Sequence, residues 1–96
     1  MFMNDFVNAD LTGFSQKLVD QYVKVKWSVD KCGYACSDHA SWTKAGYASM
    51  MPFEATMKTD NKAIHTDHDT IQLIDFNHSL AFAKLALAFA AELSSL

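Results

Sequence analysis

Hydrophobic residues in the first part of the chain repeat with a helical period after a short apolar start. Residues 1–6 form a brief apolar run that predicts a strand. The apolar positions that follow have the i, i+3, i+7, i+11 spacing of an amphipathic helix, and they are Leu11, Phe14, Leu18 and Tyr22. Asn8 or Asp10 can cap this helix, because a short polar side chain accepts a hydrogen bond from the free amide groups of the first turn. We therefore expect a strand and then a helix.

The hydrophobic period changes to two at residue 23. Four apolar residues alternate with polar ones in a pattern typical of a strand with one wet face: Val23, Val25, Trp27 and Val29. A tight loop is expected at residues 32–36. Ser37 is then a suitable N-cap for a short second helix, and Gly46 is a suitable C-terminal stop.

The last part of the chain is predicted to hold a strand, a long loop and a helix. Residues 47–54 read as a strand with Pro52 near its end, where a missing backbone donor is tolerated. Residues 55–70 are polar and follow neither period, which indicates a long loop of the kind that is usually functional or disordered. The final helix begins at Phe76 or Asn77 and is apolar on most of its circumference, so we expect it to be buried.

The predicted element order is strand, helix, strand, helix, strand, loop, helix. Alternating strands and helices favour an α/β fold with a parallel or mixed sheet that is covered on both faces. Three strands do not complete such a sheet, and the last helix needs more apolar surface than they offer. We therefore expect residues 1–96 to form one partial domain that is incomplete by itself.

Charge and composition exclude some partners. The formal net charge is -3, without a basic block, which argues against nucleic acid or an anionic membrane as a partner. None of the eight cationic side chains is an arginine, so the chain lacks the residue best suited to bidentate recognition of phosphate. Residues 80–93 contain Lys84 and Glu92 and are too short for a bilayer, which needs about 20 apolar residues.

Two groups of residues carry candidate chemistry. His65-Thr66-Asp67-His68-Asp69-Thr70 places imidazoles and carboxylates at short spacing, which suits zinc but also suits a solvated polar loop. Cys32 and Cys36 fit either a disulfide in an exported protein or two reduced thiols in a cytosolic one. The spacing alone does not decide between these alternatives.

Several segments, taken in order, resemble the C-terminal part of bacterial leucyl aminopeptidases of the Vibrio type, which are secreted dizinc exopeptidases. The resemblance covers nearly the whole chain, and the Cys-Gly-Tyr-Ala-Cys loop is its most specific motif. The matching segments are Cys32-Gly33-Tyr34-Ala35-Cys36-Ser37-Asp38-His39-Ala40-Ser41-Trp42, Ala45-Gly46-Tyr47, Met51-Pro52-Phe53-Glu54, Ile64-His65-Thr66 and Asp69-Thr70.

The resemblance implies roles for individual residues. It makes His65 a zinc ligand, and it makes Tyr34 a phenol that hydrogen-bonds the substrate carbonyl as this becomes tetrahedral. It also implies a disulfide between Cys32 and Cys36, and export to a secreted or periplasmic location. The residues that it places around the pocket for an apolar N-terminal side chain are Cys32, Cys36, Met51, Phe53 and Ile64.

Some matching residues also have simpler interpretations. Met51 and Phe53 fit core packing equally well, because an apolar strand end looks the same in both cases. Ser37 and Asp38 are explained as a helix cap and a first-turn charge, and His39 as a structural residue or a residue beside the metal ligands.

The chain departs from the family pattern in ways that limit its expected activity. Ala48 stands where the family usually has proline. The family's other zinc ligands and its glutamate base lie upstream of the matching segment, and the only glutamates here are Glu54 and Glu92. We therefore expect a fragment of a zinc aminopeptidase that acts on peptides with an apolar N-terminal residue, is inactive alone and forms a homo-oligomer. The alternatives are a self-associating binding module without catalytic activity and a small independent metal-binding domain built on His65, Asp67, His68 and Asp69.

Overall fold

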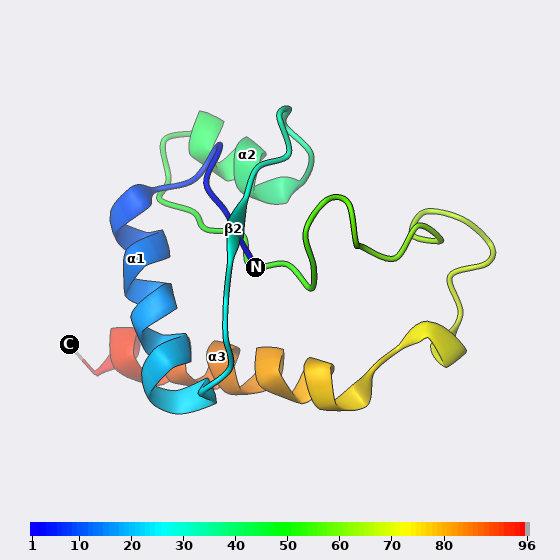
Figure 1. Cartoon of the computed structure of the whole chain (residues 1–96). Helices are drawn as coiled ribbons and strands as arrows, with labels where there is room; N and C mark the ends of the chain where they lie inside the picture. Colours follow the sequence, from blue (N-terminus) through cyan, green and yellow to red (C-terminus); the bar gives the residue numbers. More distant parts are fainter. Residues whose placement is uncertain (96) are drawn as a thin grey trace.

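The computed structural model describes residues 1–95 and contains helices around a very small sheet (Figure 1). The elements in chain order are β1 (Phe2–Met3), α1 (Ala9–Leu18), the π-helix η1 (Val19–Val23), β2 (Val29–Asp30), α2 (Asp38–Lys44), the 3-10 helix η2 (Ile71–Leu73) and α3 (Phe76–Ser94). The strands lie at the centre of the molecule, with α3 on one side and α2 on the other.

Strand β1 is the centre of the sheet. It pairs in parallel with β2, with Phe2 opposite Val29, and the Asn4 amide donates to the Asp30 carbonyl at 2.9 Å. On its other side β1 meets residues 51–53, where the structure forms a single antiparallel bridge between Phe2 and Pro52. Both neighbours of β1 therefore come from later parts of the chain.

The predicted strands are much shorter in the structure, and one is absent. The run at residues 1–6 is a strand only at Phe2–Met3, and the alternating run at residues 23–29 pairs only at its last residue. Residues 47–54 form no strand and contribute only the bridge at Pro52. The predicted strand at residues 23–29 was wrong for most of its length, because Val23 ends η1, Lys24 is left-handed, and a strand also needs a partner, which the exposed Val25 (47%) and Trp27 (37%) lack.

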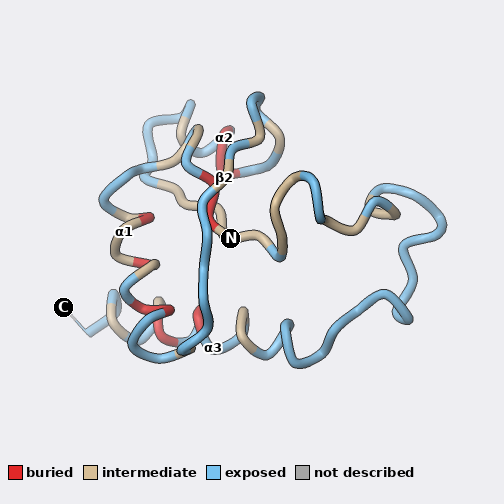
Figure 2. The backbone as a smooth tube through the Cα atoms, in the orientation of Figure 1, coloured by how far each residue is buried: buried red, intermediate tan, exposed pale blue. Residues whose placement is uncertain are grey.

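The core lies where α1, η1 and α3 meet beneath β1 (Figure 2). The Asn8 side chain accepts from the Leu11 amide at 2.8 Å and so caps α1, as predicted. The helix continues as η1 and ends at Lys24, whose φ of 59° is left-handed. The buried core residues are Phe2, Leu18, Val19, Leu85 and Ala88.

Helix α3 begins where the sequence predicted but is buried along only one side. Asp75 caps it by accepting from the His78 amide at 3.1 Å. Within α3 only Leu85 and Ala88 are buried, whereas Leu87 is 73% exposed, so the prediction of a buried helix was wrong for this chain by itself. The physical reason is that α1 and η1 cover a narrower stripe than the apolar surface of α3. Over residues 1–95 the structure contains no helix both long enough and apolar enough to cross a membrane.

Candidate functional site

The predicted catalytic tyrosine lies on a short loop that a disulfide closes. Cys32 and Cys36 are bonded, with their Cα atoms 6.2 Å apart, which confirms the pairing that the resemblance implied. Tyr34 stands at the middle of the loop and is 62% exposed. Gly33 has a φ of 83°, a left-handed conformation that residues with a Cβ rarely adopt.

The carboxylate of Asp5 holds this loop. Its Oδ1 atom accepts from the Cys32 amide at 3.1 Å and its Oδ2 atom accepts from the Gly33 amide at 2.8 Å. Burial acts to raise the pKa of Asp5, but the hydrogen bonds from the Gly33 and Cys32 amides, together with that from its own amide and the charge of His39, outweigh burial, so the pKa lies below its ordinary value. Asp5 is therefore an anion at neutral pH that fixes two successive amide groups.

Helix α2 follows the loop and carries the Ser-Asp-His motif. Ser37 takes the N-cap position, but its side chain makes no capping hydrogen bond, so that part of the prediction was wrong. The Ser37 backbone is extended, with φ of -155° and ψ of -177°. His39 is 5% exposed, and neither of its ring nitrogens has a hydrogen-bond partner within the described residues. His39 is thus a buried polar group that the rest of residues 1–95 leaves unsatisfied.

Three predicted pocket residues are attached to β1. The Met51 carbonyl accepts from the Met3 amide at 2.9 Å, and the Phe53 amide donates to the Met1 carbonyl at 2.8 Å. The disulfide sulfur of Cys32 lies 3.6 Å from the Met3 thioether sulfur. Cys32, Met51 and Phe53 are therefore positioned by the most buried strand of the chain.

Met51 also lines an open groove beside α2. The groove has a volume of about 550 Å³. Its wall includes Ser37, Asp38, the buried His39 and Trp42 from the α2 region. Residues of the Ser-Asp-His motif thus line the same groove as one predicted pocket residue.

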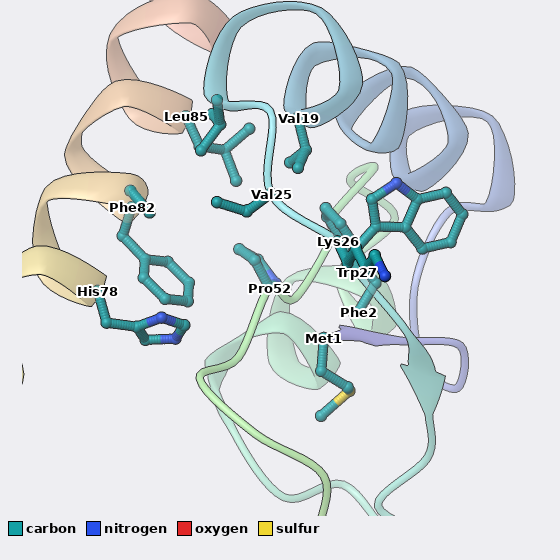
Figure 3. A pocket seen from close by; sticks show the side chains of 12 residues that line it. Met1, Phe2, Val19, Val25, Lys26, Trp27, Pro52, His78, Phe82 and Leu85 are labelled. Atoms are coloured by element: carbon teal, nitrogen blue, oxygen red, sulfur yellow. The ribbon is translucent and has the colours of Figure 1, made fainter.

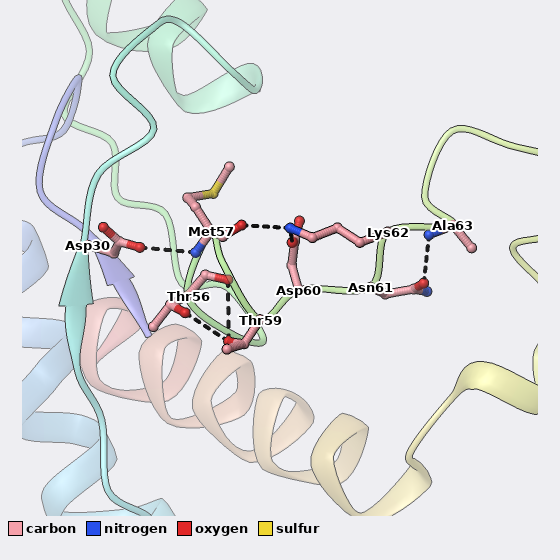
Figure 4. A network of polar contacts seen from close by, with 8 residues as sticks. All are labelled: Asp30, Thr56, Met57, Thr59, Asp60, Asn61, Lys62 and Ala63. Atoms are coloured by element: carbon pink, nitrogen blue, oxygen red, sulfur yellow. Dashed lines mark hydrogen bonds and ion pairs between the residues drawn. The ribbon is translucent and has the colours of Figure 1, made fainter.

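The predicted polar loop is present and is held by hydrogen bonds along its own length (Figure 4). Asp30 connects it to β2, because its Oδ2 atom accepts from the Met57 amide at 3.0 Å. Lys62 donates from Nζ to the Met57 carbonyl at 2.7 Å and forms an ion pair with Asp60. The hydrogen bonds from Met57 and Lys31 lower the pKa of Asp30.

The predicted zinc ligand is near the far end of this loop. His65 is exposed and has a φ of 64°, which is uncommon for a residue other than glycine. Ile64 is half-buried beside it. The Nε2 atom of His68 lies 3.6 Å from Asp67, but within residues 1–95 no three His, Cys, Asp or Glu side chains are grouped to hold a metal ion. Among the described residues, the alternative of an independent metal site therefore lacks a set of ligands brought together on this loop.

A second, smaller pocket lies between α3 and the chain that precedes β2 (Figure 3). It has a volume of about 50 Å³ and includes Val25, Trp27 and Pro52. On α3, His78 and Phe82 meet edge to face at 5.3 Å between ring centroids, and the His78 ring lies 3.1 Å from the Glu54 carbonyl. Its lining contains none of the residues that the resemblance placed at the substrate.

A model of Peptidase family M28 matches residues 2–90 of this chain. Because the match spans most of its length, the chain belongs to Peptidase family M28. Leucine aminopeptidase 1 of Emericella nidulans is 48% identical over 92 residues, and that of Aspergillus oryzae is 49% identical over 92 residues. In both cases the alignment covers 96% of this chain and 24% of the relative, so the chain spans about a quarter of the length of these relatives.

Two solved structures are similar to the whole chain. The Legionella pneumophila LapA aminopeptidase matches with a TM-score of 0.95 and 39% identity, over 99% of this chain and 26% of that one. LapB from the same organism matches with a TM-score of 0.92 and 41% identity, over 96% of this chain and 25% of that one. This likeness confirms the predicted fold class, the C-terminal portion of a mixed α/β aminopeptidase fold.

Two residues that position the loops were missed in the sequence. Asp5 and Asp30 were not singled out, although each carboxylate accepts two backbone amides and ties together distant segments. The sequence signal that could have found them is their position, because both lie at or just after the end of a short strand. Carboxylates at such positions often satisfy the amides of neighbouring loops.

Proposed function

We propose that this chain forms part of the catalytic domain of a zinc-dependent aminopeptidase that removes apolar residues from the N-terminus of peptides. The observation that carries the proposal is the close likeness to the LapA aminopeptidase, at 39% identity, over 99% of this chain. Relatives from both fungi and bacteria are similar to it, so a place in the bacterial Vibrio-type branch stays a prediction. So does the secreted or periplasmic location, for which the Cys32–Cys36 disulfide is the supporting feature.

In this proposal His65 supplies one zinc ligand. Its left-handed backbone supports the assignment, because residues held in rare conformations cluster at functional sites. Tyr34 is proposed to donate a hydrogen bond to the oxygen that becomes negative when the peptide carbonyl turns tetrahedral. The zinc, when bound, would polarise that carbonyl and activate water. Cys32, Cys36, Met51, Phe53 and Ile64 are proposed to line the pocket for the apolar side chain.

The chain by itself is proposed to be inactive. A catalytic zinc usually needs about three protein ligands. Within the part of the chain that the structure describes, the side chains around His65 do not provide such a set. The remaining ligands and the general base would come from the other three quarters of the peptidase domain.

A chimera tests this function directly. Residues 1–96 would replace the aligned part of LapA, and hydrolysis of leucine p-nitroanilide would be measured together with bound zinc. We expect an active enzyme in which His65→Ala removes zinc and activity, whereas Tyr34→Phe lowers kcat and retains zinc. His68→Ala is the matched control, because His68 is exposed on the same loop. A folded, active chimera that tolerates His65→Ala would refute the assignment.

A self-associating binding module is the second candidate, and one observation favours it. Leu80 and Leu87 on α3 are 53% and 73% exposed, and Val25, in the segment that precedes β2, is 47% exposed. Burial of apolar surface contributes about 25 cal/mol per Å², so these exposed side chains favour pairing with a second copy of the chain. Light scattering over a dilution series is expected to show a dimer that Leu87→Lys weakens. A compact monomer at micromolar concentration would contradict this.

A further inference from the structure

The loop that carries Tyr34 depends on hydrogen bonds from outside itself. Among the hydrogen bonds of residues 1–95, the backbone amides of residues 32–36 that find an acceptor are those of Cys32 and Gly33, and both donate to Asp5. The disulfide closes the loop into a ring but does not fix the direction in which the ring points. Without Asp5 the ring would turn about the chain on either side of it.

Asp5 connects this ring to the buried core of the chain. It follows β1, whose residues Phe2 and Met3 are 2% and 1% exposed. Next to Asp5, Phe6 has a φ of 57°, and this left-handed turn directs the chain away toward α1. The carboxylate therefore stands at a corner between the most buried strand and the loop.

Asp30 gives an independent example of the same device. Its Oδ1 atom accepts from the Lys31 amide at 2.8 Å, and its Oδ2 atom accepts from the Met57 amide at 3.0 Å. Each of the two loops that carry candidate site residues is thus held by one aspartate. Asp5, just after β1, holds the 32–36 loop, and Asp30, at the end of β2, holds the 55–70 loop. This parallel makes Asp30 a matched control for Asp5.

We propose that Asp5 is a positioning residue that orients the Cys32–Cys36 ring, and with it the Tyr34 phenol, toward the substrate. The inference rests on the proposed aminopeptidase function only in the role that it gives to the Tyr34 phenol at the substrate. That Asp5 orders the ring is a property of this chain. The two parts can be tested separately.

The first test is NMR on the full 96-residue chain, with Asp5→Asn and Asp30→Asn as a matched pair. Asn keeps the shape and one acceptor oxygen but loses the charge that strengthens both hydrogen bonds. We expect Asp5→Asn to raise solvent exchange of the Cys32 and Gly33 amides about tenfold and to lower the order parameters of Gly33 and Tyr34. Asp30→Asn is expected to raise exchange of the Met57 amide and to leave Gly33 unchanged. Unchanged exchange at Gly33 in Asp5→Asn, or equal loosening over the whole chain, would overturn the proposal.

If the Asp5→Asn variant does not fold, a pH titration of the wild-type chain still tests whether Asp5 orders the ring. The amide shift of Gly33 should follow the titration of the Asp5 carboxylate with the same midpoint, because the two groups are hydrogen-bonded. The charge of His39 also acts on Asp5, so the His39 ring must be followed in the same titration. A Gly33 shift that follows another group would refute the ordering role.

The second test concerns Tyr34 and uses the LapA chimera. Asp5→Asn should lower kcat more than it changes KM, and its effect should largely disappear in a background of Tyr34→Phe, because both changes remove the same contribution. Full additivity would show that Asp5 does not act through Tyr34. An inactive chimera combined with the expected NMR pattern would reject the proposed function and retain the ordering role of Asp5.

Discussion

The two loops that carry the candidate site residues are stabilised in different ways. The 32–36 loop is short, is closed by a disulfide and is held by Asp5 next to the buried strand β1. The 55–70 loop is long and runs away from the helices before it returns to α3 (Figure 1). Asp30 holds it near its start, and beyond Met57 its hydrogen bonds are mainly to neighbouring residues, such as Ala63 to Asn61 at 2.9 Å.

This difference shows which part of the site the chain can preorganise alone. The ring that carries Tyr34 is closed by the disulfide and is attached beside β1 through the two hydrogen bonds to Asp5, so the place of Tyr34 is largely set by residues 1–36. His65 lies beyond many locally bonded residues, all in a segment with little burial. Its final position is therefore expected to depend on the metal and on the surrounding domain.

The largest effect is expected from Phe2→Ala, because both loops are attached to the strands that Phe2 holds in the core. Phe2 is 2% exposed, packs with Leu18 and Leu85, and meets Trp27 edge to face at 5.9 Å. Loss of a buried Phe costs about 3 to 5 kcal/mol, which we expect to find by denaturant unfolding. Leu87→Ala is the control, with a change within about 0.5 kcal/mol because Leu87 is 73% exposed. Equal effects of the two variants would mean that the core is misassigned.

Removal of the disulfide should affect one loop and spare the other. Replacing Cys32 and Cys36 by serine frees a ring with a sequence separation of 4, and loss of such a short closed loop costs about 2 kcal/mol of unfolding free energy. Amide exchange should rise at Gly33 and Tyr34 and stay constant at Met57. If exchange rises equally in both loops, the two are not anchored independently.

Acid should release the 32–36 loop through Asp5. The pKa of Asp5 is lowered in the folded chain, so its contribution to stability is complete above the unfolded value of about 3.9 and is lost as the pH falls through the lower folded value. Exchange at Gly33, corrected for intrinsic rates, should therefore increase below about pH 4. This pH dependence should vanish in Asp5→Asn, whereas that of the Met57 amide, which follows Asp30, should persist. Persistence at Gly33 in the variant would exclude Asp5 as its origin.

The smallest effect is expected from Lys62→Ala in the long loop. Lys62 bonds to the Met57 carbonyl and to Asp60, and although the Asp60 side chain is only 8% exposed, the Lys62 side chain is 67% exposed, and ion pairs with an exposed partner contribute about 0 to 1 kcal/mol. Thermal unfolding should hardly change, while exchange around Met57 and Ala63 increases. A loss comparable to that of Phe2→Ala would show that the long loop is part of the core after all.

The sequence predicted the helices well because each carries its own signals. The periodic apolar positions of α1 and its cap at Asn8 depend on residues that are close along the chain. The strands were predicted too long, since residues 23–29 and 47–54 have strand-like patterns but lack partners for most of their length. A pattern shows which side chains suit a sheet, whereas pairing depends on distant chain.

Of the candidate site, the structure confirms the Cys32–Cys36 disulfide, which came from resemblance rather than from spacing, while the roles of Met51 and Phe53 at the pocket stay predictions. Asp5 and Asp30 were missed because the loop amides that they hold, those of Cys32, Gly33 and Met57, lie 27 or 28 residues further along the chain. Contacts of this kind leave no local period in the sequence.

We propose that this chain carries one zinc ligand and a preorganised tyrosine loop, but not a complete metal site. Titration of the 96-residue chain with zinc, followed by calorimetry, tests this claim most directly. We predict no tight stoichiometric binding, with at most weak heat that His65→Ala reduces and His68→Ala reduces equally. Tight binding of one zinc ion per chain that His65→Ala abolishes and His68→Ala preserves would contradict the account, because residues 1–96 would then assemble a metal site around His65 by themselves.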